Sequence, residues 1–381
     1  MSTTTSTDTH AVAPALLDAC RTRLSKLRVA AGKHNAAAFL VSHPSDVAYL
    51  TGFLGGDSYL IVPTDASARP LLISDFRYAE ELEAHRPLCD LFMREKTMTQ
   101  ALKSLLPERV KGLTAVQGDH LTYSEFDTLA EAVGRASLVP TSSILLKLRA
   151  VKDAIEVENI RRAIDIQQKA LLEVLPTVRP GRTELDVAAQ LEAEMKRRGS
   201  VNPGFPSIVA AQANGSLPHY SPGPVEVKAH MPLLIDWGAQ FNGYRSDMTR
   251  TFTLARWPEQ VREIYPIVLE AYQKSAAALA PGKSGAEIDA VARDVITKAG
   301  FGDKFGHGLG HGIGLAIHEE PRLSHRGDAS VLEPGNVVTV EPGIYLPGVG
   351  GVRLEDDYLI TPTGAERLNS LPMDIQWATL G

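Results

Sequence analysis

Hydrophobic positions in the first 150 residues alternate between the spacings of helices and of strands. Cys20, Leu24 and Leu27 recur at steps of four and three residues, which places them on one face of a helix. Pro, Gly and Asp separate the runs that follow, so we predict a small α/β domain. The strand-like runs lie at 37–41, 59–62 and 70–74, and the further helical patterns at 77–84, 97–106 and 124–133.

The second part of the chain opens with a long helical pattern over 153–175 and contains a weak internal repeat. The segment 180–186, PGRTELD, resembles 281–289, PGKSGAEID. Each copy leads into a helical pattern that ends at a glycine, Gly199 or Gly300, and glycine-punctuated strand sequence follows. We predict an α+β domain made of two related helix-plus-sheet halves, although two unrelated capped helices would give the same pattern.

Length and composition fit this division. The chain has 381 residues, 44% of them hydrophobic and 22% charged, which is ordinary for globular proteins and long for one domain. We predict a disordered leader over residues 1–15, a first domain over 16–148 and a second over 149–381. No apolar run is long enough to predict a membrane span.

Charge and cysteine content exclude several classes of function. A net charge of −6 lacks the basic footprint of nucleic-acid binding. Cys20 and Cys89 are too few for a disulfide framework or a thiolate metal site, and a cytoplasmic location fits that count. Neither a G-x-S-x-G motif nor a complete phosphate-binding glycine loop occurs, so serine-hydrolase and nucleotide-binding functions lack support. We expect neither nucleic acid nor a membrane as partner.

Two aspartates stand on the arms of a predicted hairpin. Asn242-Gly243 separates two β-rich runs, and this dipeptide is a strong signal for a tight turn. Asp236 and Asp247 lie on opposite arms at nearly equal distance from the turn, so their carboxylates can converge on one face. Asp236 follows an apolar run, where an unpaired carboxylate is costly. The two acids therefore share a site, or they are solvated acids of an ordinary hairpin.

A second hairpin-like stretch carries more acids. Glu341 ends the apolar run 337–340, and the chain returns after a glycine-rich loop. Alternation along the returning strand puts Arg353, Glu355 and Asp357 on one face. Four carboxylates thus stand at apolar strand positions of the two hairpins: Asp236, Asp247, Glu341 and Glu355. Their mutual repulsion would raise their pKa values steeply unless cations neutralise them.

The glycine-rich segment 306–318 supplies histidines. His307, His311 and His318 are three of the chain's 11 histidines, and the glycines among them let the backbone approach a site closely. Their spacing differs from the H-E-x-x-H helix of zinc proteases. His219 stands alone in another loop, and its surroundings fit a loop histidine as well as a site residue.

Two aspartates, two glutamates and a histidine make an oxygen-rich ligand set. Such a set suits Mn²⁺, Co²⁺ or Fe²⁺ better than structural zinc, although zinc also fits. Five side chains can bind two ions when carboxylates bridge them, and water held between the ions would ionise near neutral pH. The sequence thus predicts a dinuclear metal site whose bound water attacks a carbonyl.

In this order the motifs resemble those of the pita-bread metallopeptidases, the family of methionine aminopeptidase, aminopeptidase P and prolidase. The N-terminal segments 46–53 and 75–78 resemble the creatinase-type domain of the Xaa-Pro branch. The other matching motifs are D-x10-D at Asp236 and Asp247, G-H-x-x-G-L-x-x-H-E-x-P at 310–321, E-P-G-I-Y at 341–345 and R-x-E at 353–355.

Matched residue by residue, this resemblance implies ligands and catalytic groups. The implied ions are two divalent metals, Mn²⁺ first, with Co²⁺, Fe²⁺ or Zn²⁺ as alternatives. Asp247 and Glu355 would bridge both ions, His219 and His318 would also hold the substrate, and Glu341 would assist proton transfer. The implied ligands are Asp236, Asp247, His311, Glu341 and Glu355. The implied catalytic residues are His219, His307, His318, Glu341 and Arg353.

The resemblance also implies a fold and an activity. The fold would be an α/β creatinase-like N-terminal domain followed by an α+β pita-bread catalytic domain. The activity would be metal-dependent hydrolysis of the Xaa-Pro bond at the N-terminus of short proline-containing peptides, by a homodimer or tetramer. Arg322 stands where some prolidases hold an arginine for the free carboxylate of a dipeptide, which favours a dipeptidase over aminopeptidase P. A metal-independent creatinase-like hydrolase and a non-catalytic binding module are the alternatives.

Overall fold

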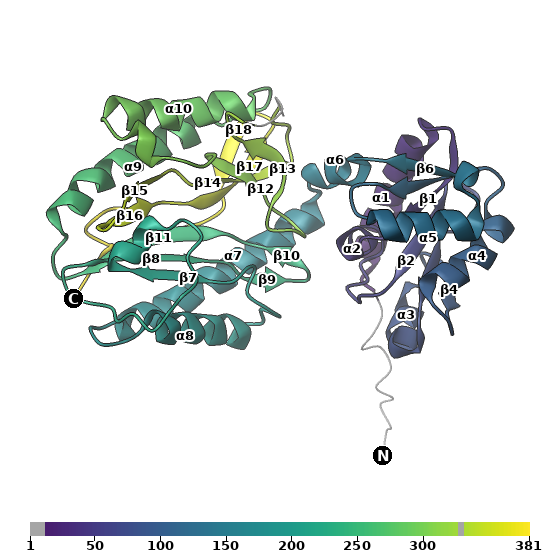
Figure 1. Ribbon diagram of the computed structural model, residues 1–381, viewed down its shortest axis with the longest axis horizontal. Helices are drawn as coiled ribbons and strands as arrows, with labels where there is room; N and C mark the ends of the chain where they lie inside the picture. Colours follow the sequence, from purple (N-terminus) through teal and green to yellow (C-terminus); the bar gives the residue numbers. More distant parts are fainter. Residues whose placement is uncertain (1–11, 327–330) are drawn as a thin grey trace, which may run out of the picture. The chain divides into compact units, whose positions relative to one another are not determined.

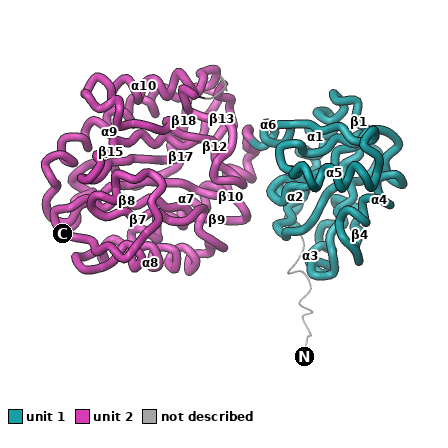
Figure 2. The backbone as a smooth tube through the Cα atoms, in the orientation of Figure 1, with its two compact units in different colours: residues 1–149 teal, residues 150–381 magenta. Residues whose placement is uncertain are grey.

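The computed structural model describes residues 12–326 and 331–381, which form two compact units (Figure 2). Unit 1 ends at Arg149 and unit 2 begins at Ala150, one residue later than the predicted boundary. Of the predicted leader, residues 1–11 lie outside the described residues. Helix α1 (Pro14–Gly32) begins inside the predicted leader, because proline suits the first turn of a helix. Within the described ranges, no helix is long and apolar enough to cross a membrane.

Unit 1 is built on a mixed sheet with the strand order β4-β3-β2-β1-β5-β6. Leu40 of β1 and Ile61 of β2 lie in a core that also contains Leu102 and Leu105 of α4. The strands are β1 (Ala36–Val41), β2 (Tyr59–Pro63), β3 (Leu71–Ser74), β4 (Asp90–Met93), β5 (Leu113–Gln117) and β6 (Leu138–Thr141). The helices after α1 are α2 (Pro44–Thr51), α3 (Ala79–Leu82), α4 (Met98–Arg109), α5 (Tyr123–Val133) and α6 (Ile144–Ala150).

The single helix predicted over 77–84 is wrong. A 3₁₀ turn over Phe76–Tyr78, the short helix α3 and a second 3₁₀ turn over Glu83–His85 replace it. The carboxylate of Asp75 accepts hydrogen bonds from the Arg77 backbone N–H at 3.1 Å and from its guanidinium at 2.8 Å. Asp75 therefore caps a tight turn at the point where the pattern predicted a regular helix.

In unit 2, strands lie between helices, with α8 and α10 on opposite sides of them (Figure 1). Both copies of the predicted repeat form helix starts with reciprocal capping boxes, Thr183 with Asp186 and Ser284 with Glu287. The helices are α7 (Ala154–Val174), α8 (Glu184–Arg197), α9 (Glu259–Ala278) and α10 (Gly285–Lys298).

The strands of unit 2 form two larger sheets and two short hairpins. One sheet has the order β19-β11-β8-β7 and the other β13-β12-β14-β17-β18, while β9 pairs with β10 and β15 with β16. The first-sheet strands and their hairpin are β7 (Ile208–Ala211), β8 (Pro232–Trp237), β9 (Gln240–Phe241), β10 (Tyr244–Arg245), β11 (Met248–Leu254) and β19 (Thr379–Leu380). The others are β12 (Gly310–Gly312), β13 (Glu319–Leu323), β14 (Val337–Val340), β15 (Gly343–Leu346), β16 (Gly350–Arg353), β17 (Asp356–Thr361) and β18 (Gly364–Arg367).

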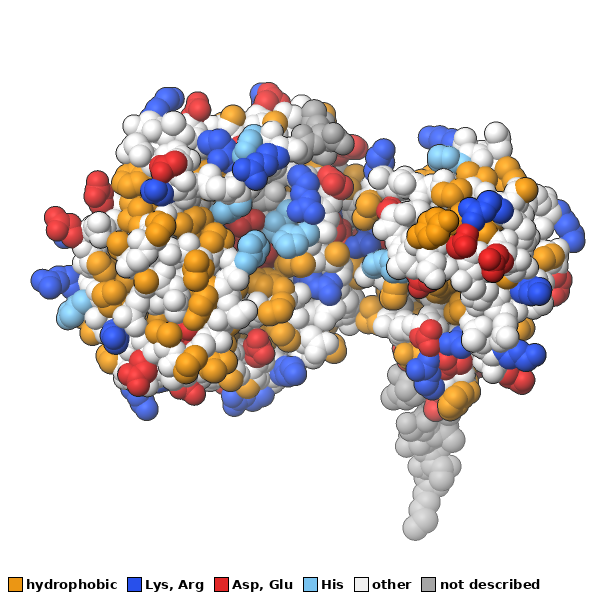
Figure 3. All heavy atoms as spheres, in the orientation of Figure 1, with side chains coloured by type: hydrophobic (Ala, Val, Ile, Leu, Met, Phe, Trp, Pro, Cys, Tyr) orange, Lys and Arg blue, Asp and Glu red, His pale blue; other side chains and the backbone are white. Residues whose placement is uncertain are grey.

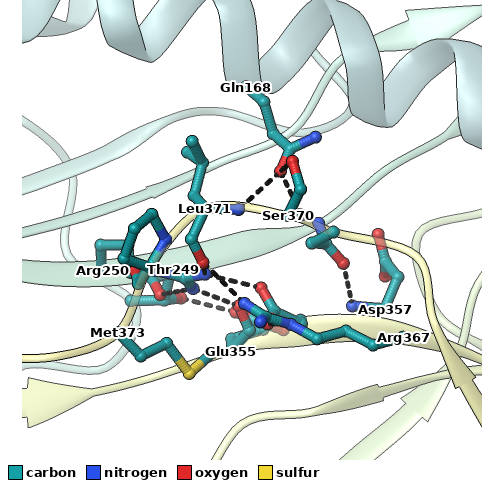
Figure 4. A network of polar contacts seen from close by, with 12 residues as sticks. Gln168, Thr249, Arg250, Glu355, Asp357, Arg367, Ser370, Leu371 and Met373 are labelled. Carbon is teal, nitrogen blue, oxygen red and sulfur yellow. Dashed lines mark hydrogen bonds and ion pairs between the residues drawn. The ribbon is translucent and has the colours of Figure 1, made fainter.

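A buried arginine on β11 ties the two sheets together (Figure 4). The guanidinium of Arg250 is fully buried and donates to the Glu355 carbonyl at 2.7 Å and to the Leu371 carbonyl at 3.0 Å. It also pairs with the buried carboxylate of Asp356 at 2.8 Å. Because a buried charge is tolerated only when it is fully partnered, this network fixes the backbone of Glu355 relative to β11.

Candidate active site

One cavity of about 610 Å³ in unit 2 brings together all the predicted metal ligands, catalytic residues and substrate-binding residues. Figure 3 shows histidine side chains gathered around a hollow on this unit, with acidic side chains deeper inside it. The predicted residues that line the cavity are His219, Asp236, Asp247, His307, His311, His318, Arg322, Glu341, Arg353 and Glu355.

The first hairpin places its two aspartates as the sequence pattern predicts. Asn242 and Gly243 both have positive φ, 46° and 84°, which is the conformation that a tight hairpin turn requires. Asp236 lies on β8 directly opposite Thr249 of β11, and Asp247 immediately precedes β11. Both carboxylates are buried, so they meet at one floor of the cavity instead of facing solvent.

The second predicted hairpin is wrong in its pairing. Glu341 follows β14, but β14 pairs with β17, whereas β15 and β16 form a separate hairpin. Glu355 lies between β16 and β17, where the chain passes from one sheet to the next. The hydroxyl of Thr249 donates to Oε2 of Glu355 at 2.5 Å and so orients this carboxylate from the neighbouring strand.

This change of sheet also corrects the predicted face of Arg353, Glu355 and Asp357. Strand alternation does not continue through the break, so Asp357 is not among the residues that line the cavity. Its carboxylate instead accepts a hydrogen bond from the backbone N–H of Asp247 at 3.1 Å. Asp357 thus lies behind the acidic floor and supports the backbone of Asp247.

His311 on β12 turns an unprotonated nitrogen toward the acids. Its Nδ1 lies 3.1 Å from the carbonyl of Gly312, which can only accept, so Nδ1 carries the proton and Nε2 keeps its lone pair. Nε2 lies 3.4 Å from Oε1 of Glu341 and 3.7 Å from Oδ2 of Asp247. A lone pair that faces two ionised carboxylate oxygens is unfavourable unless a cation or a carboxylic-acid proton lies between them.

Glycines allow β12 to come close enough for this arrangement. A Cβ at Gly310 would lie 2.1 Å from the Thr339 carbonyl oxygen, and one at Gly312 would lie 2.2 Å from the Glu320 carbonyl oxygen. Any larger residue at either position would push β12 away from its neighbouring strands. The alternating glycines of this segment therefore serve close backbone packing on both sides of His311.

The pKa values of the buried groups show that burial and mutual repulsion outweigh the nearby charge of Arg353 in this acidic cluster. Burial, together with repulsion from neighbouring carboxylates, raises the pKa values of Asp247 and Glu355 well above their usual range. Burial raises the pKa of Glu341 to about 8 and lowers the pKa of His311 to about 3. Without a cation the acids favour their protonated forms, whereas a bound cation would stabilise them as carboxylates.

Two further observations fit a divalent metal. Oδ1 of Asp236 and Oδ1 of Asp247 are buried and have no hydrogen-bond partner within the described part of the chain. Asp247, His311 and Glu355 offer ligand atoms that all lie within 4.8 Å of one another. Carboxylate oxygens with one imidazole suit ions such as Mn²⁺, Fe²⁺, Co²⁺ and Zn²⁺. The residues present therefore fit the metal site predicted from the sequence.

A hydrogen-bonded chain leads from His307 to the acidic floor. Nδ1 of His307 lies 2.7 Å from the Gly308 carbonyl and must donate to it, so Nε2 accepts from the Tyr345 hydroxyl at 2.8 Å. Arg353 donates to the same hydroxyl at 2.9 Å and to Oδ2 of Asp236 at 2.5 Å. Tyr345 was missed as a functional residue, because within the E-P-G-I-Y segment it has the pattern of an ordinary strand tyrosine.

The remaining predicted residues lie on the exposed wall of the cavity. His219, His318 and Arg322 are all exposed, in contrast to the buried acids. The rings of His318 and His311 meet edge to face with centroids 4.4 Å apart. Arg322 of β13 stands directly opposite His311 of β12 in the strand ladder, so the two side chains share one face.

Buried carboxylates hold the loops that carry the two wall histidines. Glu184, at the start of α8, accepts hydrogen bonds from the Tyr220 hydroxyl at 2.8 Å and from the Gly223 N–H at 2.9 Å, on the loop that carries His219. Glu319 follows His318 and pairs with the buried Lys152 at 3.0 Å. Neither of these supporting interactions was predicted, because both acids look like ordinary helix or loop residues in the sequence.

An apolar side of the cavity completes the site. It was not predicted, because its residues come from three separate segments and share no period. Together they offer a non-polar surface next to the acidic floor, as expected of a small-molecule site. They are Phe205, Pro206, Ile208, Pro218 and Ile317.

Comparison with known proteins places this arrangement in a family. Residues 158–362 match the model of metallopeptidase family M24, and residues 23–151 match that of the creatinase/prolidase N-terminal domain. The chain belongs to metallopeptidase family M24. The predicted fold, a creatinase-like domain followed by a pita-bread catalytic domain, is confirmed.

The relatives of this M24 chain include Xaa-Pro dipeptidases and an X-Pro aminopeptidase. The chain is 34% identical to the Xaa-Pro dipeptidase of Pyrococcus furiosus, covering 93% of this chain and 99% of that protein. The solved Xaa-Pro dipeptidase from Bacillus anthracis matches with a TM-score of 0.89 and 34% identity, covering 93% and 99% of the two chains. The X-Pro aminopeptidase from Thermotoga maritima matches with a TM-score of 0.85 and 33% identity, covering 92% and 98%.

Proposed function

We propose that this chain is a dinuclear metal-dependent exopeptidase that hydrolyses the Xaa-Pro bond of short peptides, with Xaa-Pro dipeptides as its main substrates. The observation that carries the proposal is the unprotonated Nε2 of His311 facing Glu341 and Asp247 on a buried acidic floor. The names of the relatives support the Xaa-Pro bond as the target. The bond to proline lacks an N–H and fixes φ, which calls for a dedicated site.

In this proposal the floor of the cavity holds the metals. Two divalent ions, once bound, would supply Lewis acidity and a water of lowered pKa. Asp247 and Glu355 would contact both ions. The full ligand set would be Asp236, Asp247, His311, Glu341 and Glu355.

The other residues would hold the peptide and move protons. Glu341 takes the proton of the attacking water and delivers it to the proline nitrogen, which leaves as a secondary amine when the C–N bond breaks. His219 and His318 hold the substrate carbonyl and stabilise the oxyanion that forms on it. Arg353 keeps Asp236 in place, and His307 shares the hydroxyl of Tyr345 with Arg353.

The position of Arg322 favours a dipeptidase over a longer-peptide aminopeptidase. Arg322 stands opposite His311 in the β12–β13 ladder, and no hydrogen bond or ion pair among the described residues uses its guanidinium. An arginine one strand away from the ligand set can bind the carboxylate of a residue directly after the scissile bond. In a dipeptide, that residue is the C-terminal proline.

We further propose Mn²⁺ as the native ion, a homodimer or tetramer as the assembly and the cytoplasm as the location. Oxygen-rich ligands support Mn²⁺, although Co²⁺, Fe²⁺ and Zn²⁺ suit the same donors. Cys20 and Cys89 are both buried and free, which fits a reducing compartment.

The deciding experiment assays Xaa-Pro dipeptides and Xaa-Pro-Xaa tripeptides side by side with Mn²⁺, Co²⁺ or Zn²⁺ and after chelation. We expect two bound ions per chain, loss of activity with chelator and faster turnover of dipeptides. Activity that survives chelation would support the creatinase-like alternative. A folded protein that binds no metal would support a non-catalytic module.

A further inference from the structure

His307 stands between two glycines and needs to be held from outside its own segment. Gly306 and Gly308 lose more conformational freedom on folding than any other residue would, so the backbone on both sides of His307 is intrinsically permissive. The imidazole nevertheless makes specific hydrogen bonds to the Gly308 carbonyl and to Tyr345. A neighbouring element must therefore fix this backbone.

Two residues one turn apart on α10 contact that backbone on both sides. Arg293 donates from Nε and Nη2 to the two carboxylate oxygens of Asp289, both at 2.8 Å. The same guanidinium donates to the Phe305 carbonyl at 2.9 Å and to the His307 carbonyl at 2.8 Å. Asp289 accepts from the N–H of Leu309 at 3.0 Å. These bonds lie before Gly306, between the two glycines and after Gly308.

The surroundings of the pair make these bonds strong. The Asp289 side chain is fully buried and that of Arg293 is 23% exposed, so water competes little for their hydrogen bonds. The guanidinium lies over the ring of Phe305, 4.4 Å from its centroid, and this ring packs edge-on against His307. Nδ1 of His325 lies 3.4 Å from Oδ2 of Asp289, the carboxylate oxygen that also accepts from Nε of Arg293.

Asp289 and Arg293 differ from a second ion pair with a four-residue spacing, Asp294 and Lys298 at the end of α10. Lys298 and Asp294 are 80% and 71% exposed, lie 3.8 Å apart and join only two positions of their own helix. Exposed pairs of this kind contribute little to stability. Lys298 therefore provides a matched control for Arg293, because it is also a cation with a carboxylate four residues earlier.

We propose that Asp289 and Arg293 are positioning residues for His307: they fix the carbonyl before Gly308 and the N–H after it, and so hold the imidazole in register with Tyr345. The consequence for turnover rests on the proposed peptidase function. The consequence for the imidazole does not. The line of contacts runs from α10 through His307 and Tyr345 to Arg353 and the acidic floor.

Three variants separate the parts of the pair. Arg293→Gln removes the charge and the multiple bonds, Arg293→Lys keeps the charge but lacks the fork that reaches three acceptors, and Asp289→Asn keeps the shape and the Leu309 bond. In Arg293→Gln we expect kcat for an Xaa-Pro dipeptide to fall about 10- to 100-fold, as for small misplacements of a catalytic group. KM should change much less, two ions should still bind, and Lys298→Gln should behave as the unaltered protein.

A second readout needs no substrate. In chain labelled with ¹⁵N-histidine, the Nδ1–H signal of His307, identified by its loss in His307→Gln, should shift or broaden in all three variants and stay in place in Lys298→Gln. An unchanged signal with unchanged kcat in folded Arg293→Gln would overturn the proposal. If Arg293→Gln does not fold, Arg293→Lys and Asp289→Asn decide by the same two criteria. A shifted signal in a protein that cleaves no Xaa-Pro peptide would refute the peptidase function and leave the positioning role supported.

Discussion

The imidazole of His311 presents its unprotonated Nε2 to Oε1 of Glu341 across 3.4 Å. The other nitrogen of His311 is occupied by the carbonyl of Gly312, so this imidazole cannot rotate its proton toward the acid without losing that bond. Glu341 must then carry a proton of its own or share a cation with His311. These two alternatives make the cluster sensitive to both pH and metal.

In the metal-free protein we expect stability to fall as the pH rises. Burial raises the pKa of folded Glu341 to about 8, above the 4.5 of a solvated glutamate. Between these values the folded state holds a proton that the unfolded state has released, so the free energy of unfolding decreases as pH increases through this range. The melting temperature of chelated protein, measured from about pH 5 to about pH 8, checks the sign.

The same linkage predicts that metal stabilises more at high pH. Metal binding displaces the protons of the acidic ligands, so the difference in melting temperature between loaded and chelated protein should grow toward pH 8. Glu341→Gln should flatten the pH dependence of the chelated protein. A chelated protein that melts higher at pH 8 than at pH 5, with the same slope in Glu341→Gln, would contradict this account.

Asp247→Ala should remove both ions together. Asp247 is assigned to both metals, and its buried Oδ1 has no partner among the described residues. We expect nearly complete loss of bound metal and of peptidase activity while circular dichroism stays unchanged. Elemental analysis of the purified variant measures this, with Asp294→Ala on the exposed face of α10 as the control. Two ions in a fully active Asp247→Ala protein would refute the ligand assignment.

The hydroxyl of Thr249 should matter for metal affinity although it is no ligand. It accepts from Nε of Arg353 at 3.0 Å and donates to Glu355 at 2.5 Å, so it aligns a proposed bridging carboxylate. Thr249→Val keeps the shape and removes both bonds. We expect metal affinity to drop by about 10- to 100-fold, as for other outer partners of metal ligands. Metal affinity is measured by titrating the metal-free protein with the ion, and Thr253→Val, on the same buried strand, should leave that affinity unchanged.

His318→Ala should spare the metals and slow the reaction. His318 is exposed on the cavity wall and its ring packs edge to face with that of His311, and it is not among the proposed ligands. We expect two bound ions and a lower kcat, whereas His311→Ala should lose metal. Loss of a metal from His318→Ala would instead make His318 a ligand.

The acids of the site were predictable because each follows or faces an apolar run, and the Asn242-Gly243 turn fixes the register of the first two. The strand that pairs with β14 was not predictable, because strand pairing depends on tertiary packing, which the local hydrophobic pattern does not reveal. Extending the alternation through the break at Glu355 therefore misplaced Asp357. Tyr345 becomes visible as a site residue through its contacts with His307 and Arg353.

The residues that hold the loops were equally hidden. Glu184 occupies the first turn of a capped helix, where acids are common for their own local reasons. Asp289 lies one turn further into α10, and Arg293 four residues later gives it the spacing of an ordinary ion pair on a helix. Gly285 shows the same limit: a Cβ there would lie 1.9 Å from the Arg322 carbonyl oxygen, so a glycine in the helix start marks a contact with a strand 37 positions later in the chain. Such contacts have no signature in the neighbouring sequence.

Arg322 should make the enzyme sensitive to the length of the substrate. If its guanidinium pairs with the carboxylate of a bound dipeptide, Arg322→Ala should raise KM for Xaa-Pro by up to the equivalent of about 1.5–3 kcal/mol, the range of hydrogen bonds to charged groups. A tripeptide carries its carboxylate one residue further from the scissile bond, so its cleavage should change far less.

Two comparisons make this result specific to the pairing. Arg326→Ala removes a second arginine from the same cavity wall and tests whether positive charge alone matters. Arg322→Lys keeps the charge but cannot bind a carboxylate with two parallel bonds, so it should recover only part of the dipeptide KM. Equal effects of Arg322→Ala on dipeptides and tripeptides would mean that Arg322 does not read the end of the substrate. The same loss in Arg326→Ala would mean that the wall acts only through its charge. An equal effect of Arg322→Ala on both substrates, or none on either, would remove the argument for a dipeptidase and favour an aminopeptidase of the P type.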